Sequence, residues 1–287
     1  DTDQWGVDYP DCAGNMQSPI DIDTTKTVFS PHLRPIQLSG YSLPASQKLK
    51  LSNNGHTALL ELPESLAITD GYAQQYRAVQ LHLHWGSPER YLPVGTAIAG
   101  RSPFGPCPCR YGGVSVLQVG PRENPYYQEI LEHLYDIQRK GQQVLVPGFN
   151  IAGLLPANLK HYFHYNGSLT TPACYQTVKW TVFNQTMLLS RGQMSRLLMS
   201  LRNDDSKALQ NNYRLAQDLH GRRVLASFQT TLSSGDDTRA GDVLAVLFGV
   251  LFAITALAFL LYLYKHRSQN ARLDSQTKSK VIYTAAT

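Results

Sequence analysis

Apolar and polar residues alternate along several short stretches of this chain, most regularly between residues 79 and 85. Because successive side chains of a β-strand point to opposite faces, the alternation predicts a strand over residues 76–85 with two unlike faces. The apolar positions are expected to pack inward, while Gln80, His82 and His84 share the polar face. The two imidazoles would then stand about 7 Å apart along one side of the strand.

Elsewhere before residue 240, the sequence pattern predicts mainly short strands and few helices. Residues 86–111 differ in kind, because they are rich in Pro, Gly, Cys and Arg and carry hardly any periodic pattern. The pattern predicts strands within 36–62, at 114–119, on both sides of a loop within 162–183 and at 223–228, with helices at 126–140, 154–159 and 195–201.

One apolar stretch stands apart from the rest of the chain. Residues 243–264 contain no charged residue and no proline, and about 22 residues at ~1.5 Å each span the ~30 Å hydrocarbon core of a bilayer. Basic residues follow this stretch and acidic residues dominate before it, which predicts an extracellular N-terminal part. We expect a type I single-pass plasma membrane protein whose signal peptide has been removed or omitted. The expected order is an extracellular domain (1–231, with an atypical insert at 86–111), a linker (232–242), the membrane helix (243–264) and a cytoplasmic tail (265–287).

Small residues recur every four positions in the membrane helix, at Ala245, Gly249 and Ala253. This spacing permits close contact between two helices and makes a homodimer a hypothesis, with an ordinary scatter of small residues as the equal alternative. The formal net charge of +5 is modest. Since the basic residues form no cluster interleaved with aromatics, we do not expect a nucleic-acid partner.

Cysteines and sequons are consistent with an extracellular domain. Four cysteines allow three disulfide pairings, and the sequence alone leaves them open. We favour Cys12 with Cys174; a bridge between Cys107 and Cys109, which flank a single proline, is awkward. Of two sequons, we expect Asn184 to carry a glycan and the Asn-Gly-Ser sequon at residues 166–168 to be too enclosed for one.

The histidine pair has two interpretations when it is taken alone. It is either a solvent-facing strand that happens to carry two histidines, or a pair of neutral imidazoles that converge on one metal ion, for which zinc is the common choice. The remaining motifs favour the second interpretation.

Five separated motifs occur in one order along the chain. They are Gln-Ser-Pro-Ile-Asp-Ile (17–22), Asn-Gly-His (54–56), Gln-Leu-His-Leu-His-Trp (80–85), Asn-Gly-Ser-Leu-Thr-Thr-Pro (166–172) and Asn-Tyr-Arg (212–214). With them the chain resembles the α-class carbonic anhydrases over most of residues 5–85 and 112–231. The cysteines at 12 and 174 and the single apolar helix are similar to those of the membrane-anchored extracellular members.

The resemblance implies a mixed α+β fold dominated by one large twisted, mainly antiparallel central β-sheet with short flanking helices, plus the transmembrane helix. It also implies a conical cleft with a Zn²⁺ ion at its base, held by three histidines. In this family the zinc lowers the pKa of its bound water to ~7, and the resulting hydroxide attacks carbon dioxide to give bicarbonate.

The resemblance assigns roles to individual residues. His82 and His84 match the first two zinc ligands. Gln80 and Asn212 match the groups that hydrogen-bond those imidazoles and set their tautomers. His56 matches the proton shuttle, for which an imidazole that titrates near neutral pH is suited.

The substrate side of the site is matched as well. Thr170 matches the threonine whose hydroxyl accepts a hydrogen bond from the zinc-bound hydroxide. Thr171 lies at the substrate edge. The apolar wall, where an uncharged linear gas should sit, is matched by Leu169, Val116, Val178 and Trp180.

The chain departs from the family pattern at the third zinc ligand. The family carries this histidine on the strand paired with the first ligand strand, whereas no histidine occurs here between His84 and His133. We expect that strand to be absent, with residues 86–111 in its place. Residues 94–99 are the alternative for a replacement strand, although Gly95 and Gly100 make this segment a poor strand former. The glutamate that partners the threonine is missing too, and Glu89 is the only acid between His84 and Glu123.

Catalytic zinc needs three protein ligands and an open position, so two ligands should lower its affinity by several kcal/mol. No spacing supports a thiolate from Cys107 or Cys109 as the third. Three interpretations stay open. The favoured one is an active zinc-dependent carbonic anhydrase for which residues 86–111 reflect a mispredicted exon or a splice form, because the other site residues remain together. The second is a catalytically silent relative that acts as a binding or adhesion module, and the third is a membrane-tethered adhesion or receptor-like protein without metal chemistry.

Overall fold

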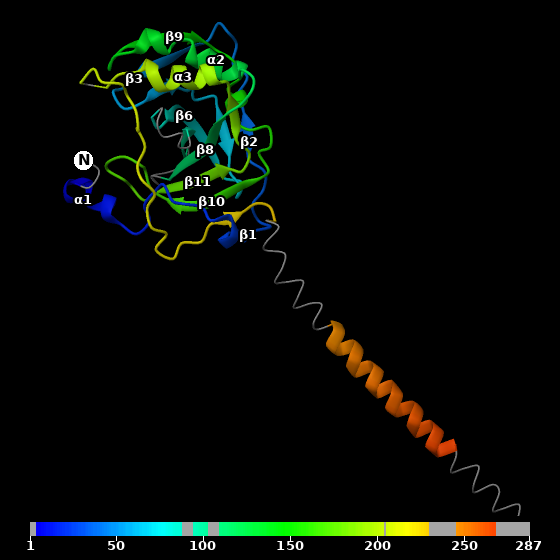
Figure 1. Cartoon of the computed structure of the whole chain (residues 1–287). Helices are drawn as coiled ribbons and strands as arrows, with labels where there is room; N and C mark the ends of the chain where they lie inside the picture. Colours follow the sequence, from blue (N-terminus) through cyan, green and yellow to red (C-terminus); the bar gives the residue numbers. More distant parts are fainter. Residues whose placement is uncertain (1–3, 88–93, 103–108, 204, 230–244, 268–287) are drawn as a thin grey trace, which may run out of the picture. The chain divides into compact units, whose positions relative to one another are not determined.

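The computed structural model describes residues 4–87, 94–102, 109–203, 205–229 and 245–267. The chain divides into two compact units, residues 1–230 and 231–287. The first unit carries the β-sheet and the short helices, and the second carries one long helix (Figure 1).

A single sheet organises the first unit. Its described residues form 13 strands in the order β1-β13-β10-β11-β8-β7-β6-β4-β3-β9, with β12 beside β8 and β5 joining β2 to β6. Most neighbours are antiparallel, and the parallel pairs are β1 with β13 and β8 with β11 and β12. The expected fold class is therefore confirmed. The strands are β1 Val28–Phe29, β2 Gln37–Ser39, β3 Lys48–Asn53, β4 Ala58–Glu61, β5 Ala67–Thr69, β6 Gln75–His84, β7 Val94–Arg101, β8 Arg110–Val119, β9 Gln143–Pro147, β10 Tyr162–Gly167, β11 Val178–Phe183, β12 Met187–Leu189 and β13 Leu225–Ala226.

The helices are short, and their ends follow from capping residues. The helix expected over 126–140 is interrupted: α2 begins at Pro125 after the Asn124 cap, and a separate short helix, η4, follows it. The helix expected at 195–201 begins earlier, because Ser190 and Gln193 form a capping box. The helices are α1 Trp5–Asp8, η2 Pro10–Ala13, η3 Thr24–Lys26, α2 Pro125–Leu131, η4 Leu134–Ile137, η5 Ile151–Leu154 and α3 Arg191–Ser200.

The predicted histidine strand is confirmed as β6, near the middle of the sheet (Figure 1). Leu81, Leu83 and, just beyond the strand, Trp85 are fully or almost fully buried in the main hydrophobic core. The intervening positions, His82 and His84, are partly exposed on the other face. The sheet thus separates a packed side from a side that is open to a cavity.

The prediction that the strand beside the histidine strand is absent is wrong, and the alternative of a strand at 94–99 is confirmed. Val94–Arg101 forms β7, which pairs antiparallel with β6 on one side and with β8 on the other. Two-sided pairing satisfies the backbone N–H and C=O groups of a strand whose own sequence is a poor strand former. Tertiary context therefore overrides the weak local propensity of this glycine-containing segment.

Small residues in β7 fit the space between its neighbours. A Cβ atom at Gly100 would lie 3.2 Å from the Tyr76 Cβ and 3.4 Å from the Tyr111 Cβ, and 3.3 Å from a backbone oxygen. On the packed side, the buried Thr96 hydroxyl lies 2.7 Å from the Tyr127 hydroxyl of α2, whose O–H donates to the backbone oxygen of Leu154 at 2.9 Å. These contacts fix which face of β7 points toward the cavity.

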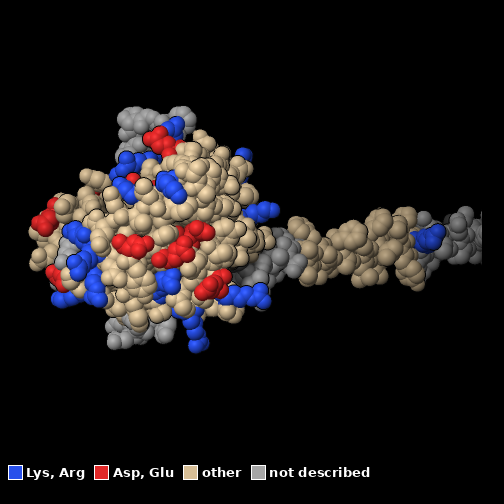
Figure 2. Space-filling view, turned by 90° about the horizontal axis from the view of Figure 1, so that it is seen from above, with Lys and Arg blue, Asp and Glu red and all other residues tan. Residues whose placement is uncertain are grey.

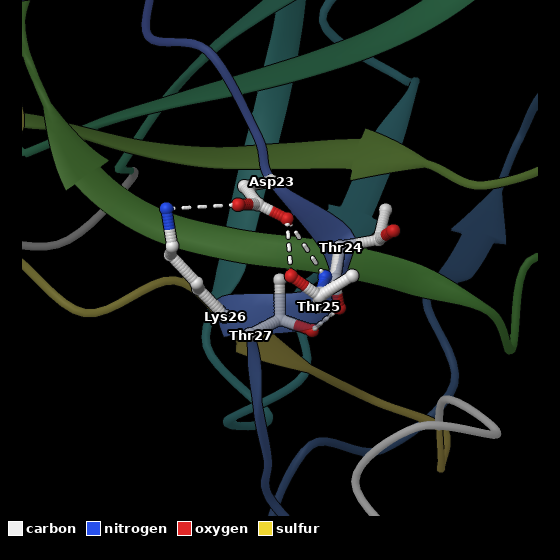
Figure 3. Close-up of polar contacts among 5 residues, drawn as sticks. All are labelled: Asp23, Thr24, Thr25, Lys26 and Thr27. Carbon is white, nitrogen blue, oxygen red and sulfur yellow. Dashed lines mark hydrogen bonds and ion pairs between the residues drawn. The ribbon is translucent and has the colours of Figure 1, made fainter.

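A local network of polar contacts shapes the segment before β1. The Asp23 carboxylate accepts hydrogen bonds from the backbone N–H and the hydroxyl of Thr25, at 3.0 and 2.6 Å, and lies 3.0 Å from the Lys26 ammonium (Figure 3). The contacts with Thr25 and Lys26 lower the pKa of Asp23 to about 2. They cap η3 at its start and lead the chain into β1, which pairs with β13.

The second unit contains the helix Ala245–Arg267, which is long and apolar enough to cross a membrane by length and composition. It covers most of the span predicted at 243–264, and the first two residues of that span lie outside the described part of the chain.

We predict that the two glycines of β7 respond differently to alanine. A methyl group at Gly95 would meet only atoms at 3.8 Å or beyond, whereas at Gly100 it would press against Tyr76, Tyr111 and backbone. Gly100→Ala should lower the free energy of unfolding by about 1–3 kcal/mol through overpacking, and Gly95→Ala should change it by less than about 0.5 kcal/mol. Denaturant unfolding of the full chain in detergent, followed by tryptophan fluorescence, measures both. Equal effects at the two positions would contradict the β7 register.

Candidate functional site

Most of the predicted site residues line one cavity of about 610 Å³ in the first unit. The cavity lies on the polar face of β6 and is bordered by β7, β8, β11 and the loop after β10. Its lining includes these residues named from the sequence: His56, Gln80, His82, His84, Leu169, Thr170, Thr171, Val178, Trp180 and Asn212.

The two histidines of β6 form an edge-to-face pair at the cavity floor. Their ring centroids lie 5.0 Å apart, with an interplanar angle of 80°. Desolvation lowers the pKa of His82 to about 3, with a further contribution from His84. Desolvation also lowers the pKa of His84. Both imidazoles are therefore neutral at physiological pH, which is the form that binds a metal ion.

Asn212 connects the histidine strand to its surroundings. The His84 Nδ1–H donates to the Asn212 backbone oxygen at 2.6 Å, which leaves the lone pair of Nε2 for a ligand. The Asn212 side chain accepts from the Trp85 backbone N–H at 2.7 Å and donates to the backbone oxygens of His56 and Leu83 at 2.9 and 3.1 Å. The structure thus brings Asn212 to the position predicted for it, with its backbone as the partner of the imidazole.

Gln80 and His82 do not form the predicted hydrogen bond. Gln80 lines the cavity beside His82, yet the His82 Nδ1 atom is buried and has no hydrogen-bond partner among the described residues. The tautomer of His82 is therefore not fixed by a neighbour in the way that the tautomer of His84 is.

His56 stands at the exposed rim of the cavity. Its backbone N–H donates to the Asn54 side chain at 2.9 Å, and its backbone oxygen accepts from Asn212. Gly55 precedes it with a φ of 89°, a conformation that glycine adopts without strain. This tight turn holds a histidine side chain between the cavity and solvent.

The loop that carries Thr170 and Thr171 is fastened to the N-terminal segment. Cys12 and Cys174 form a disulfide across 162 residues, which confirms the favoured pairing. The Ser18 backbone N–H donates to the Ser168 hydroxyl at 3.0 Å, and the Ser168 backbone N–H donates to the Ser18 hydroxyl at 3.0 Å. These reciprocal bonds hold the loop at the edge of the cavity.

Arg214 is a supporting residue to which the sequence analysis gave no role, although it lies in one of the five motifs. Its guanidinium donates to the Gln17 side chain at 2.7 Å and to the backbone oxygens of Ser18 and Cys12 at 3.1 and 2.9 Å. It also lies over the ring of Trp5, 5.6 Å from its centroid. The spacing of Asn212 and Arg214 was the only sequence signal for this arrangement.

The apolar wall differs in part from the expected one. Leu169, Val178 and Trp180 line the cavity, but Val116 does not; Gly112 of β8 lines it instead. Val116 lies four residues further along the strand, about 13 Å away at ~3.3 Å per residue. A Cβ at Gly112 would fall 2.5 Å from the Trp180 ring, so only glycine lets the indole lie there.

In the part of the chain that the structure describes, two imidazoles are the metal-binding groups at the cavity floor. Among the described residues, no group of three or more His, Cys, Asp or Glu could hold a metal ion. Cys109 is disulfide-bonded and supplies no thiolate, and Cys107 and Glu89 lie outside the described residues. The residues present therefore do not fit a zinc ion held by three protein ligands.

Comparison with known proteins places these features in a family. The model of the eukaryotic-type carbonic anhydrases matches residues 1–95 and 113–228. The chain belongs to the carbonic anhydrase family. It is 36% identical over 249 residues to bovine carbonic anhydrase 6, which covers 79% of this chain and 78% of the relative. It is 33% identical over 309 residues to human carbonic anhydrase 12, which covers 99% of this chain and 86% of the relative.

The match to the carbonic anhydrase family has one gap. Residues 96–112 are unmatched, and they include most of β7 and the start of β8. The unmatched segment therefore includes most of the strand beside the histidine strand, and its residues 97–101 and 110–112 line the cavity.

The surface of this carbonic anhydrase domain bears on two other expectations. Asn184 is exposed just after β11, as a glycan acceptor requires, but its glycosylation stays a prediction. The expectation that Asn166 is enclosed is wrong, because its side chain is exposed on β10.

On the face drawn in Figure 2, Lys and Arg are interspersed with Asp and Glu and form no continuous basic patch.

We predict that His82 makes stability depend on pH when no metal is bound. Burial lowers its pKa in the folded state to about 3 from the ordinary value of 6.5, so the unfolded chain binds more protons between these values. Stability is therefore retained above pH 6.5 and lost as the pH falls toward 3. Near pH 5, His82→Asn should reduce the slope of unfolding free energy by about 1.4 kcal/mol per pH unit.

The measurement is denaturant unfolding of the chelator-treated full chain at several pH values between 4 and 7. His32→Asn is the matched control, since His32 is exposed and lies outside the cavity. An unchanged slope in His82→Asn would show that His82 is accessible to protons in the folded chain.

Proposed function

We propose that this chain carries out the reversible hydration of carbon dioxide to bicarbonate and a proton at the outer face of the plasma membrane. The family implies carbon dioxide hydration in general. The observation that supports it for this chain is the single cavity that gathers the histidine pair, the rim histidine, the threonine loop and the apolar wall.

The apolar wall supplies the site for the substrate. Leu169, Val178 and Trp180 border the same cavity as the histidine pair. An uncharged linear gas has no hydrogen-bond donors, so it gains most from apolar surface next to a polar floor. Thr170 and Thr171, on the disulfide-fastened loop, bring hydroxyl groups to the edge of this wall, where they would position the oxygens of the substrate and of bicarbonate.

His56 is proposed as the proton shuttle. It stands at the rim, where a proton released in the cavity must cross to solvent. An imidazole is the side chain suited to accept and release a proton near neutral pH. Because Asn212 bonds both the backbone of His56 and the ring of His84, one residue sets the spacing between the rim and the floor.

Zn²⁺ is the metal that the family uses, and His82 and His84 are the residues of this chain proposed to bind it. They account for two of three family ligands, so we derive no reaction step through the metal. An exchanging ion with reduced affinity is the expected consequence.

A catalytically silent binding module is the second candidate function. It is favoured by one observation, the face of β7 opposite the histidines, where Gly95, Ala97 and Ala99 offer no metal-binding group. Such a domain would keep the cavity and lose turnover.

The membrane topology is part of the proposal. The apolar helix and the similarity to carbonic anhydrase 12 over nearly the whole chain support a single-pass protein. The disulfide supports an oxidising, extracellular location for the domain. A homodimer through Ala245, Gly249 and Ala253 stays a prediction.

We predict that carbon dioxide hydration by the full chain depends on added zinc. Stopped-flow hydration assays in detergent should show a rate that rises with zinc well beyond one equivalent, because two imidazoles hold the ion weakly. His82→Ala combined with His84→Ala should return the rate to the uncatalysed background. His161→Ala is the control, since His161 lies outside the cavity.

Two outcomes decide between the candidate functions. Zinc-dependent hydration that disappears with the double substitution supports the anhydrase. Hydration at background level across the whole zinc range, in a chain that remains folded by circular dichroism, would favour the binding module.

A further inference from the structure

The cavity face of β7 is defined by its register with β6. Ala99 pairs with Gln80, Ala97 with His82 and Gly95 with His84. Residues directly opposite each other in an antiparallel pair share a face, with Cβ atoms about 4.5–5.5 Å apart. The polar face of β6 is therefore matched across the sheet by three positions that carry at most a methyl group.

Ala97 is the position among these three that reaches the histidine pair from inside the cavity. It lines the cavity and lies directly opposite His82 and diagonal to His84. Gly95 does not line the cavity, and Ala99 lines it beside Gln80, one step further from the pair. The Ala97 methyl group is 4% exposed, so it is enclosed at the cavity floor.

The orientation of this face is fixed by the residues on either side of Ala97. Thr96 points to the packed side, where its hydroxyl contacts Tyr127, and Ile98 is 1% exposed in the main core. A slip by one residue would bring Thr96 and Ile98 into the cavity and drive Ala97 into the core, so the register is strongly specified.

We propose that Ala97 occupies the third-ligand position of a metal site whose other two ligands are His82 and His84. The site fails to hold zinc tightly because a methyl group stands where an imidazole is needed. An imidazole at this position completes a three-nitrogen site for Zn²⁺ or Co²⁺ without any change of fold. The inference rests on the proposed function only in taking His82 and His84 as metal ligands.

The ring of His82 is less constrained than the ring of His84. His84 has its Nδ1 bonded to a carbonyl oxygen, whereas the buried Nδ1 of His82 has no partner among the described residues. Buried polar atoms are usually hydrogen-bonded. A missing third ligand opposite His82 and a missing hydrogen bond on its ring therefore fall on the same side of the site.

The test compares Ala97→His with the native full chain and with Ala99→His, all in detergent. Ala99→His is the matched control, because it adds the same side chain to the same strand and the same face, opposite Gln80 rather than His82. Each protein is dialysed after loading, its zinc is counted by atomic spectroscopy, and Co²⁺ is titrated by visible absorption, which intensifies in tetrahedral sites.

Ala97→His should retain about one zinc per chain and bind Co²⁺ at least about 100-fold more tightly than the native chain, with an intense tetrahedral spectrum. A third ligand should count for at least as much as a group that only orients a ligand, for which 10–100-fold is typical. Ala99→His should behave like the native chain, and Ala97→His combined with His82→Ala should lose the gain.

Three results would overturn the proposal: a folded Ala97→His that binds no more tightly than the native chain, an equal gain in Ala99→His, or one tightly held zinc in the native chain. If Ala97→His does not fold, free imidazole added to the native chain replaces it as the third ligand. Millimolar imidazole should then strengthen Co²⁺ binding to the native chain, and an unchanged or weakened Co²⁺ affinity would overturn the proposal.

Hydration assays on the same proteins separate this inference from the proposed function. Tight zinc in Ala97→His without carbon dioxide hydration would support the ligand position and refute the anhydrase proposal. Zinc-dependent hydration by the native chain with no gain in metal affinity from Ala97→His would do the reverse.

Discussion

The antiparallel pairing of β6 with β7 is the constraint on which the cavity depends. β6 carries the histidines, and without a partner its backbone groups on that side would be buried and unpaired, which is costly. β7 supplies these hydrogen bonds and also pairs with β8 on its other side. Because of this continuous pairing, the threonine loop and the apolar wall lie beside the histidines. The wall and floor of the cavity therefore follow from this one register.

Folding and metal binding place different requirements on the residues of β7. The sheet needs a backbone of the right length with side chains small enough to fit between Tyr76 and Tyr111, and Gly100 meets that need. Metal binding needs one specific side chain at one position, and Ala97 does not provide it. A sequence can thus preserve the carbonic anhydrase fold through a segment that the family model leaves unmatched.

The sequence predicts the fold well wherever a periodic pattern or an ordered motif is present. The alternation over residues 76–85 predicts both β6 and its buried face, and the family motifs predict the threonine loop and the role of Asn212. It offers β7 only as an alternative, because glycine and alanine are weak strand formers and the pairing that stabilises them lies outside the segment itself. It misplaces Val116, because the register between β8 and its neighbours cannot be read from a motif-poor strand. The exposure of Asn166 on β10 also depends on which segments pack beside it, and the sequence does not show this.

The cavity is held by contacts made within the protein. The Cys12–Cys174 disulfide, the reciprocal bonds between Ser18 and Ser168, and the contacts of Asn212 with His56 and His84 are all made within the protein. Each of these groups is therefore positioned by contacts that do not involve residue 97. It follows that the cavity, which carries the proposed function, and the identity of residue 97, which decides how tightly the domain can hold the metal its family uses, are separate properties of this chain.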